Sequence, residues 1–253
     1  MQIQDVPFLG GAAPRNAHRT AGKLSGFALR FRGETRGPAA RYLDVGCGNG
    51  FITELVAPSF AETFAIDVEE LRLLDFHAHV RNAPGFRLFR MSAAQMAFPD
   101  ELFSFITCFE VLEHVRDVSA TVREIVRVCQ RFGVIVISVP QVWFPVENHG
   151  MKIGGHIFPR KIPGLPYLRP LHRKLAIARV FSSAGLDRLF LPLGTELLAT
   201  AYAAPQFERA ASHPGSWESR LAFLRGFLGR CEQIPVLRAL TGVSLLKAYR
   251  KVL

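Results

Sequence analysis

Short apolar runs alternate with helical patterns along the first 140 residues. The apolar runs end at or near a glycine or a polar residue, and they predict strands over residues 41–45, 63–66, 86–91, 103–108 and 132–139. The run over 132–139 is apolar almost throughout, as expected for a strand covered on both faces. Helical patterns predict helices over residues 19–32, 51–56, 69–81 and 118–130. Strands that alternate with helices in this way indicate a parallel α/β sheet.

The pattern changes after Pro140. Residues 140–170 are rich in proline and glycine, which predicts a long loop that forms a lid or a wall of a substrate site. The segment 242–252 fits either a basic amphipathic helix for a membrane surface or a strand. Between these segments, the patterns predict a helix over 173–184, a strand over 186–193 and an amphipathic helix over 217–231.

The length of 253 residues suits one domain in four parts. We expect an N-terminal helix region (1–40), a ligand-binding core (41–140), a substrate loop and helix (141–185), and C-terminal strands with inserted helices (186–253). No apolar run approaches the length of a membrane span, and the first residues show no secretory signal pattern. These features favour a cytoplasmic protein.

A glycine-rich turn links the first predicted strand to the helix that follows it. Its alternating glycines allow a sharp turn and a close approach to a ligand, in the string Asp44-Val-Gly-Cys-Gly-Asn-Gly50. A strand, a glycine turn and a helix predict a nucleotide-type site at the carboxyl end of a parallel strand. A dinucleotide fingerprint would have a third glycine at Phe51, and the acid at Asp44 would repel a diphosphate. The turn therefore favours a nucleoside with a cationic group and disfavours an oxidoreductase.

The string 44–50 resembles the first motif, D-x-G-x-G-x-G, of the class I S-adenosylmethionine-dependent methyltransferases. The resemblance extends over about residues 41–140, and more weakly to the C-terminus. It implies a Rossmann-like fold: a seven-stranded, mostly parallel sheet with helices on both faces and the last strand antiparallel. It further implies a helical and loop substrate cap in the C-terminal part, and an enzyme that uses S-adenosyl-L-methionine to methylate an acceptor (EC 2.1.1.-).

The resemblance also implies a set of cofactor-binding residues. Asp67 stands where the family places an acid on the ribose hydroxyls, and Ser92 stands where many members carry an aspartate beside adenine. The string Glu110-Val-Leu-Glu-His114 stands in the loop that lines the methyl-transfer site, although a bracing role is favoured for His114. The residues expected to bind the cofactor are Asp44, Gly46, Cys47, Gly48, Gly50, Asp67, Val68, Ser92, Ala93, Phe109 and Glu110.

The loop after the fifth predicted strand contains the candidate catalytic residues. An oxygen acceptor needs a base near neutral pH, for which histidine is the usual residue. We expect His149 as the base and Glu147 as its orienter or an alternative base, with His156 as a third candidate. The alternative is that these side chains only hold the loop in place.

The net charge of +10 lies in the second part of the chain. Residues 1–149 contain 15 Lys and Arg against 16 Asp and Glu, whereas residues 150–253 contain 16 against 5. This excess indicates either a solvated basic face or a surface for an anionic acceptor, a membrane or nucleic acid. The acceptor is expected to be a small molecule or a lipid- or glycan-linked group, with peripheral contact at the inner membrane face as one option.

Two other functions stay open at this stage. One is an RNA methyltransferase that uses the basic C-terminal region, although the Asn/Asp-Pro-Pro-Tyr/Phe motif of base N-methylation is absent. The other is a non-catalytic, cofactor-binding partner subunit. The four cysteines form no C-x-x-C pair, so we expect reduced thiols and no metal site.

Overall fold

The computed structural model describes residues 14–35, 41–147, 149–158, 162–203 and 242–253. The chain divides into two compact units, which we call unit 1 and unit 2. Unit 1 comprises Met1–Val139, Ser183–Thr200 and Leu246–Leu253, and unit 2 comprises Pro140–Ser182 and Ala201–Leu245. The predicted helix over 217–231 lies outside the described residues.

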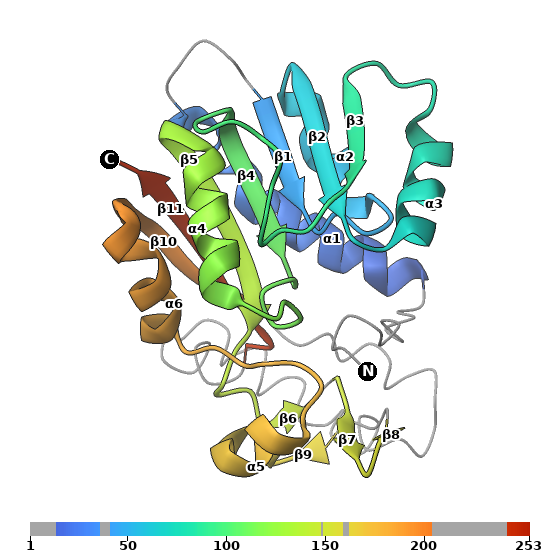
Figure 1. The fold of residues 1–253 in the computed structure, drawn as a ribbon, viewed down its shortest axis with the longest axis vertical. Helices are drawn as coiled ribbons and strands as arrows, with labels where there is room; N and C mark the ends of the chain where they lie inside the picture. Colours follow the sequence, from blue (N-terminus) through green and yellow to red (C-terminus); the bar gives the residue numbers. More distant parts are fainter. Residues whose placement is uncertain (1–13, 36–40, 148, 159–161, 204–241) are drawn as a thin grey trace, which may run out of the picture. The chain divides into compact units, whose positions relative to one another are not determined.

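A seven-stranded sheet forms the centre of unit 1 (Figure 1), in the order β10-β11-β5-β4-β1-β2-β3. The contacts of β1 with β2 and β4, of β2 with β3, and of β4 with β5 are all parallel. The strands are β1 (Arg41–Val45), β2 (Glu62–Asp67), β3 (Phe86–Arg90), β4 (Phe103–Phe109), β5 (Cys129–Pro140), β10 (Thr195–Ala203) and β11 (Ser244–Lys251). The sequence therefore predicted the first five strands correctly to within a few residues.

Helices cover both faces of this sheet, as the fold class requires. In Figure 1, α4 and α6 lie on one face, and α1 and α2 lie on the other. The helices of unit 1 are α1 (Pro14–Leu29), α2 (Phe51–Val56), α3 (Glu70–Val80), α4 (Val118–Val128) and α6 (Ser183–Phe190). Asp117 caps α4 by accepting a hydrogen bond from the amide of Ala120. All seven residues of β4 are buried, so the core runs through the middle of the sheet.

The transition from α4 to β5 differs from the prediction. The helix ends at Val128, and the strand begins immediately at Cys129, which pairs with Phe103. The pairing then shifts, so that Phe105 faces Val134. Phe132 has a φ of 63° inside this irregularity. The regular part of the strand therefore begins near residue 132, where the apolar pattern of the sequence also begins.

The predictions over residues 173–193 were wrong. The helix in the first part of this region is α5 (Arg169–Leu175), after which Ala176 is extended and bridges to Met151. The segment predicted as a strand belongs to α6 and a 3₁₀ turn (Leu191–Leu193). Leu186 and Phe190 are both buried, and their spacing of four is that of one helix face. Tertiary pairing and helical packing thus overrode the local pattern.

The last segment is a strand, as the family resemblance implies. β11 lies between β5 and β10, and it runs opposite to β1 (Figure 1). Its basic side chains have partners within unit 1: Lys247 contacts Asp187, Lys251 donates to the carbonyl of Cys129, and Arg250 contacts Glu196. The basic character of this segment therefore belongs to internal ion pairs and not to an amphipathic helix.

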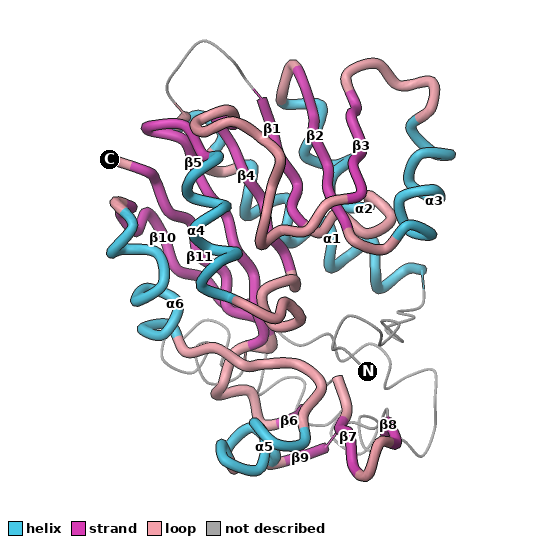
Figure 2. The backbone as a smooth tube through the Cα atoms, in the orientation of Figure 1, coloured by secondary structure: helices cyan, strands magenta, loops and turns pink. Residues whose placement is uncertain are grey.

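Within its described residues, unit 2 contains two small antiparallel sheets and the helix α5 (Figure 2). One sheet pairs β6 (Val146–Glu147) with β9 (Ile162–Pro163). The other pairs β7 (Met151–Ile153) with β8 (His156–Phe158), and α5 contacts β7. In the described part of the chain, none of the helices has the length and apolar character needed to cross a membrane.

The ion pair of Lys247 and Asp187 gives a stability prediction. Lys247 is fully buried, and its Nζ lies 2.6 Å from both carboxylate oxygens of Asp187. We expect Lys247→Met to lower the free energy of unfolding by about 3 kcal/mol, because the Asp187 charge loses its cation. Urea denaturation measures this change.

A second variant separates charge from packing in this test. Lys247→Met/Asp187→Asn removes both charges and keeps an acceptor for the hydroxyl of Tyr249, which donates to Asp187 over 2.9 Å. This double variant is expected to recover most of the lost stability. A single variant as stable as the wild type would contradict the prediction.

Candidate functional site

The carboxyl ends of β1, β2 and β4 meet at one edge of the sheet in unit 1. The glycine turn follows β1, Asp67 ends β2, and Glu110 follows β4. Parallel register pairs Asp44 with Ala65 and with Thr107, so these three strands end close together. Ligands of open α/β sheets bind at such an edge.

Two of the three glycines in the turn are required by packing. Gly46 and Gly50 have φ values of 75° and 84°. A Cβ on Gly46 would come within 2.2 Å of Val111, and one on Gly50 within 2.2 Å of the ring of Phe76. The turn is therefore pressed against the loop after β4 and against α3.

Gly48 differs from the two other glycines. Its φ is 56°, but a Cβ there would meet nothing closer than a guanidinium nitrogen of Arg72 at 3.5 Å. Its amide donates a hydrogen bond of 2.8 Å to Oδ2 of Asp67. A Cβ at Gly48 would thus be in ordinary contact with Arg72, so this position is less crowded than Gly46 and Gly50.

Asp67 is held in position by backbone amides. Its Oδ2 accepts from Gly48, and its Oδ1 accepts from the amide of Glu69 over 2.9 Å. Val68, the next residue, is 43% exposed. The carboxylate at the end of β2 is therefore fixed to the glycine turn, with an accessible apolar residue beside it.

Asp44 is buried within the protein. Its Oδ2 accepts from the hydroxyl of Thr53 over 2.5 Å, and its Oδ1 accepts from the hydroxyl of Thr107 over 2.8 Å. Burial raises the pKa of the carboxyl group to about 6, although the two hydroxyl groups oppose this shift. Asp44 therefore ties β1 to the first turn of α2 and to β4.

The cysteine of the turn contributes to the core. Cys47 packs in a cluster with Ala65, Leu73 and Phe76, and burial raises the pKa of its thiol. Its amide donates to the carbonyl of Ile66. The side chain of Cys47 is thus part of the core that supports the turn.

The loop after β3 contains Ser92 and Ala93. The side chain of Ser92 accepts from the amide of Ala94 over 3.3 Å, and Ala93 is buried. The loop then continues to Met96 and Phe98, which a pair of charged residues from α4 holds in place.

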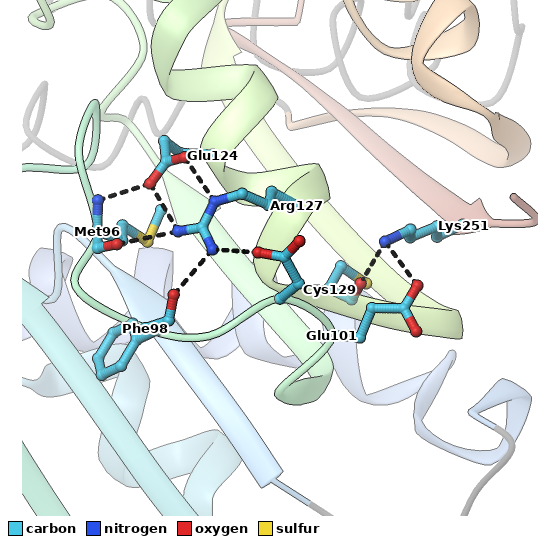
Figure 3. Close-up of polar contacts among 8 residues, drawn as sticks. Met96, Phe98, Glu101, Glu124, Arg127, Cys129 and Lys251 are labelled. Carbon is cyan, nitrogen blue, oxygen red and sulfur yellow. Dashed lines mark hydrogen bonds and ion pairs between the residues drawn. The ribbon is translucent and has the colours of Figure 1, made fainter.

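This pair, Glu124 and Arg127, was missed by the sequence analysis (Figure 3). Glu124 accepts from the amide of Met96 over 2.7 Å, and Arg127 donates to the carbonyl oxygens of Met96 and Phe98. Hydrogen bonding between the two side chains lowers the pKa of Glu124 and raises that of Arg127. Charged residues three apart on an amphipathic helix read as a solvated ion pair, so no sequence signal distinguished them.

The loop after β4 contains two neighbouring carboxyl groups. Glu110 has a φ of 55°, and its Oε1 accepts from the hydroxyl of Ser138 over 2.7 Å. Glu113 is 1% exposed, and its carboxyl oxygens have no hydrogen-bond partner among the described residues. Burial, together with the charge of Glu110, raises the pKa of Glu113. Phe109, which precedes this loop, is buried.

Unit 2 brings together Glu147 and two histidines. Glu147 is 1% exposed, and its Oε1 accepts from the amide of His149 over 2.7 Å and lies 3.2 Å from Nδ1 of the same residue. Its Oε2 lies 2.5 Å from Nε2 of His172, which is buried on α5. Although burial raises it, the hydrogen bonds from the two histidines lower the pKa of Glu147 to about 2.

The structure thus places His149 beside Glu147, as the sequence suggested, and adds His172. His156, the third candidate, is exposed on β8 and makes no contact with this cluster that the described residues show. His172 had no motif around it, and only the fold brings it to Glu147.

Taken together, the sheet order, the glycine turn after β1 and the acid at the end of β2 define a Rossmann-like, nucleoside-binding protein. Residues 43–137 match the family described as "Methyltransferase domain". These matches support a class I S-adenosylmethionine-dependent methyltransferase domain over residues 43–137, with S-adenosylmethionine as the cofactor of that family. The family resemblance, the fold class and the cofactor predicted from the sequence are confirmed.

Several curated proteins are similar to this chain. A protein of Mycobacterium tuberculosis, named as a probable S-adenosylmethionine-dependent methyltransferase, is 31% identical over 99 residues, which are 39% of this chain and 35% of that protein. A ubiquinone biosynthesis O-methyltransferase of Methylococcus capsulatus is 30% identical over 155 residues, or 57% of this chain and 62% of that protein. The chain thus spans between about a third and two thirds of the length of these relatives.

Solved structures share the fold at low sequence identity. An S-adenosylmethionine-dependent methyltransferase from Mesorhizobium loti has a TM-score of 0.57 and 18% identity, over 95% of this chain and 99% of that one. A geranyl diphosphate C-methyltransferase from Streptomyces coelicolor, in complex with S-adenosyl-L-homocysteine, has a TM-score of 0.65 and 16% identity, over 93% and 80% of the two chains.

The residues at the edge of the sheet fit this cofactor. The carboxylate of Asp67, which accepts from the amide of Gly48, is a double acceptor of the kind that ribose hydroxyls need. The roles of the individual residues stay predictions.

The buried position of Asp44 gives a pH prediction. A folded-state pKa of about 6, above the ordinary 3.8, means that the protonated form stabilises the fold. That stability is complete below about pH 4 and is lost as the pH rises through 6. Asp44→Asn does not titrate, so from pH 4 to 7 its free energy of unfolding should rise relative to the wild type by about 3 kcal/mol.

Urea denaturation of both proteins across this pH range measures the difference. Asp75→Asn, on the exposed face of α3, is the control and should follow the wild type. A difference between Asp44→Asn and the wild type that does not change with pH would overturn the assignment.

Proposed function

We propose that this chain transfers the methyl group of S-adenosylmethionine to an oxygen atom of a small-molecule acceptor or of a lipid- or glycan-linked one. The observation that carries the proposal is the buried Glu147 carboxylate at Nδ1 of His149. Such a pair suits an acceptor hydroxyl, which must lose a proton during methyl transfer. The similarity to proteins named as ubiquinone biosynthesis O-methyltransferases also supports oxygen as the nucleophile.

The cofactor-binding role belongs to the residues at the edge of the sheet in unit 1. When bound, S-adenosylmethionine supplies a methyl group on a positively charged sulfur. Asp67 would accept the ribose hydroxyls, and the backbone of Gly46, Cys47, Gly48 and Gly50 would form the wall beside it. The other residues that would contact the cofactor are Val68, Ser92, Ala93, Phe109 and Glu110. The main role of Asp44 would be to hold the glycine turn in place, so that the turn can bind the cationic part of the cofactor.

The proposed base is His149. Glu147 stays ionised at neutral pH because its pKa is about 2. An anionic Glu147 holds the proton of His149 on Nδ1, so Nε2 is the nitrogen that would take the proton of the acceptor. The same carboxylate stabilises the imidazolium that forms. His172, which binds the other oxygen of Glu147, would keep the carboxylate in this orientation.

We further propose a cytoplasmic location and reduced thiols. Cys47, Cys108 and Cys129 are free and buried, which suits a reducing compartment. Transfer of a radiolabelled methyl group to a catechol or to a total lipid extract tests the activity, with mass spectrometry to locate the methyl group. O-methylated product is expected. Cofactor binding without any transfer would instead favour a non-catalytic partner subunit.

The ribose-binding role of Asp67 predicts a specific loss of affinity. Asp67→Asn removes the charge of the carboxylate and one of its two acceptor oxygens. A hydrogen bond to a charged group contributes about 1.5–3 kcal/mol, so the Kd for S-adenosylhomocysteine should rise about 10- to 100-fold. Isothermal titration calorimetry measures it, with Asp75→Asn as the matched control. An unchanged Kd for Asp67→Asn would show that the cofactor lies elsewhere.

The proposed base predicts a change in the rate of methyl transfer. His149→Gln should lower kcat by about a hundredfold or more without changing the Kd for the cofactor. Glu147→Gln should lower kcat less, because the imidazole keeps its place but loses the carboxylate that orients it.

His156→Gln, a substitution of an exposed histidine of the same unit, is the control and should behave like the wild type. Wild-type kcat for His149→Gln across the pH range would restrict the Glu147 cluster to a structural role.

A further inference from the structure

A group of large apolar side chains lies exposed at the surface of unit 2. Trp143 is 47% exposed, Tyr167 is 52% exposed, and Leu168 and Leu171 are 56% and 43% exposed. Three of these four residues lie within five positions of one another, around the start of α5. The buried side chain of α5 that binds Glu147 is His172, whereas these four side chains are open to solvent.

Direct contacts join Trp143 to this segment. The hydroxyl of Tyr167 donates to the carbonyl of Trp143 over 2.9 Å, and the guanidinium of Arg169 lies 6.0 Å from the centre of the Trp143 ring. We therefore treat Trp143 and the exposed residues of 167–174 as one surface, which we call the aromatic-basic patch.

The charge of the patch has one sign. Arg169, Arg173 and Lys174 are all exposed. Residues 140–182 contain seven Lys and Arg and a single acid, Glu147, which is buried between two histidines. No carboxylate of this segment therefore offsets the positive charge at its surface.

We propose that the aromatic-basic patch binds the surface of an anionic lipid bilayer. Tryptophan and tyrosine have an apolar ring and a polar end, which suits the boundary between lipid headgroups and acyl chains. Exposed leucines gain free energy by entering the acyl region, and basic side chains beside them are attracted to anionic headgroups. Nucleic acid would use the positive charge but would offer no apolar medium to Leu168 and Leu171.

This inference goes beyond methyl transfer and does not depend on it. It also differs from the membrane role considered for residues 242–252, because β11 forms part of the sheet and its basic side chains are paired within unit 1. A protein that binds a bilayer at this patch would meet acceptors dissolved in or anchored to the lipid.

Vesicle flotation with the full-length protein tests the proposal. The wild type should float with vesicles of phosphatidylcholine and phosphatidylglycerol, should bind vesicles of phosphatidylcholine alone much less, and should dissociate as salt is raised. Leu168→Gln/Leu171→Gln should lower the partition coefficient at least about tenfold, because two apolar side chains no longer enter the lipid. Arg173→Gln/Lys174→Gln should lower it roughly thirtyfold on anionic vesicles.

Matched variants elsewhere on the surface control for a general change in polarity or charge. Leu71→Gln/Leu74→Gln changes two leucines of α3 that are 82% and 58% exposed, and Arg123→Gln/Arg188→Gln removes two exposed charges from α4 and α6. Both should float like the wild type, and circular dichroism should show all variants folded.

Four outcomes would overturn the proposal. They are no binding to anionic vesicles, equal binding to neutral ones, unchanged binding by both patch variants, and equal loss in the control variants. Binding to a duplex RNA that the Arg173→Gln/Lys174→Gln variant loses, with vesicle binding absent, would assign the patch to nucleic acid instead.

Discussion

The absence of a Cβ at Gly46 and Gly50 is the constraint on which the rest of unit 1 depends. At both positions a Cβ would lie 2.2 Å from a neighbouring side chain, so the turn can press directly against Val111 and Phe76. This close approach sets the start of α2 and the distance from the turn to the loop after β4. It also sets where the amide of Gly48 meets Asp67. The same packing therefore shapes the edge of the sheet at which we propose that the nucleoside binds.

Buried hydrogen bonds then make this packing specific. Asp44 joins β1 to α2 through Thr53 and to β4 through Thr107, and the hydroxyl of Tyr42 contacts Thr107 over 2.6 Å. A polar group inside a core is stable only when its partners are in place. The network therefore selects one register of β1 against β4 and holds the turn in one conformation. It does so at the expense of a carboxylate whose ionisation is disfavoured.

The parts that could be predicted from the sequence are those in which local pattern and tertiary structure agree. The first five strands and the glycine turn belong to this group. Each of the five runs has residues that favour a strand, and each forms a strand of the sheet. Residues 173–193 could not be predicted, since the pairing of Ala176 with Met151 and the burial of Leu186 are long-range events. The same reason explains why two residues of the candidate sites could not be predicted from the sequence. Arg127 has a structural role only because the loop of Met96 and Phe98 folds against it. His172 becomes a site residue only because another loop brings Glu147 to it.

In each unit a buried acid is held by hydrogen bonds, Asp44 in unit 1 and Glu147 in unit 2, whereas Glu113 has no such partner among the described residues and the basic residues around α5 are exposed. In unit 1, the basic residues of β11 are used for internal pairs, with Asp187 and Glu196 among their partners. In unit 2, Glu147 is withdrawn from the surface and held by two histidines, so it cannot offset the arginines and lysine around α5. A positive surface that served only solubility would need no exposed tryptophan or leucines beside it. The combination of both features at one place is what distinguishes a binding surface from a solvated one.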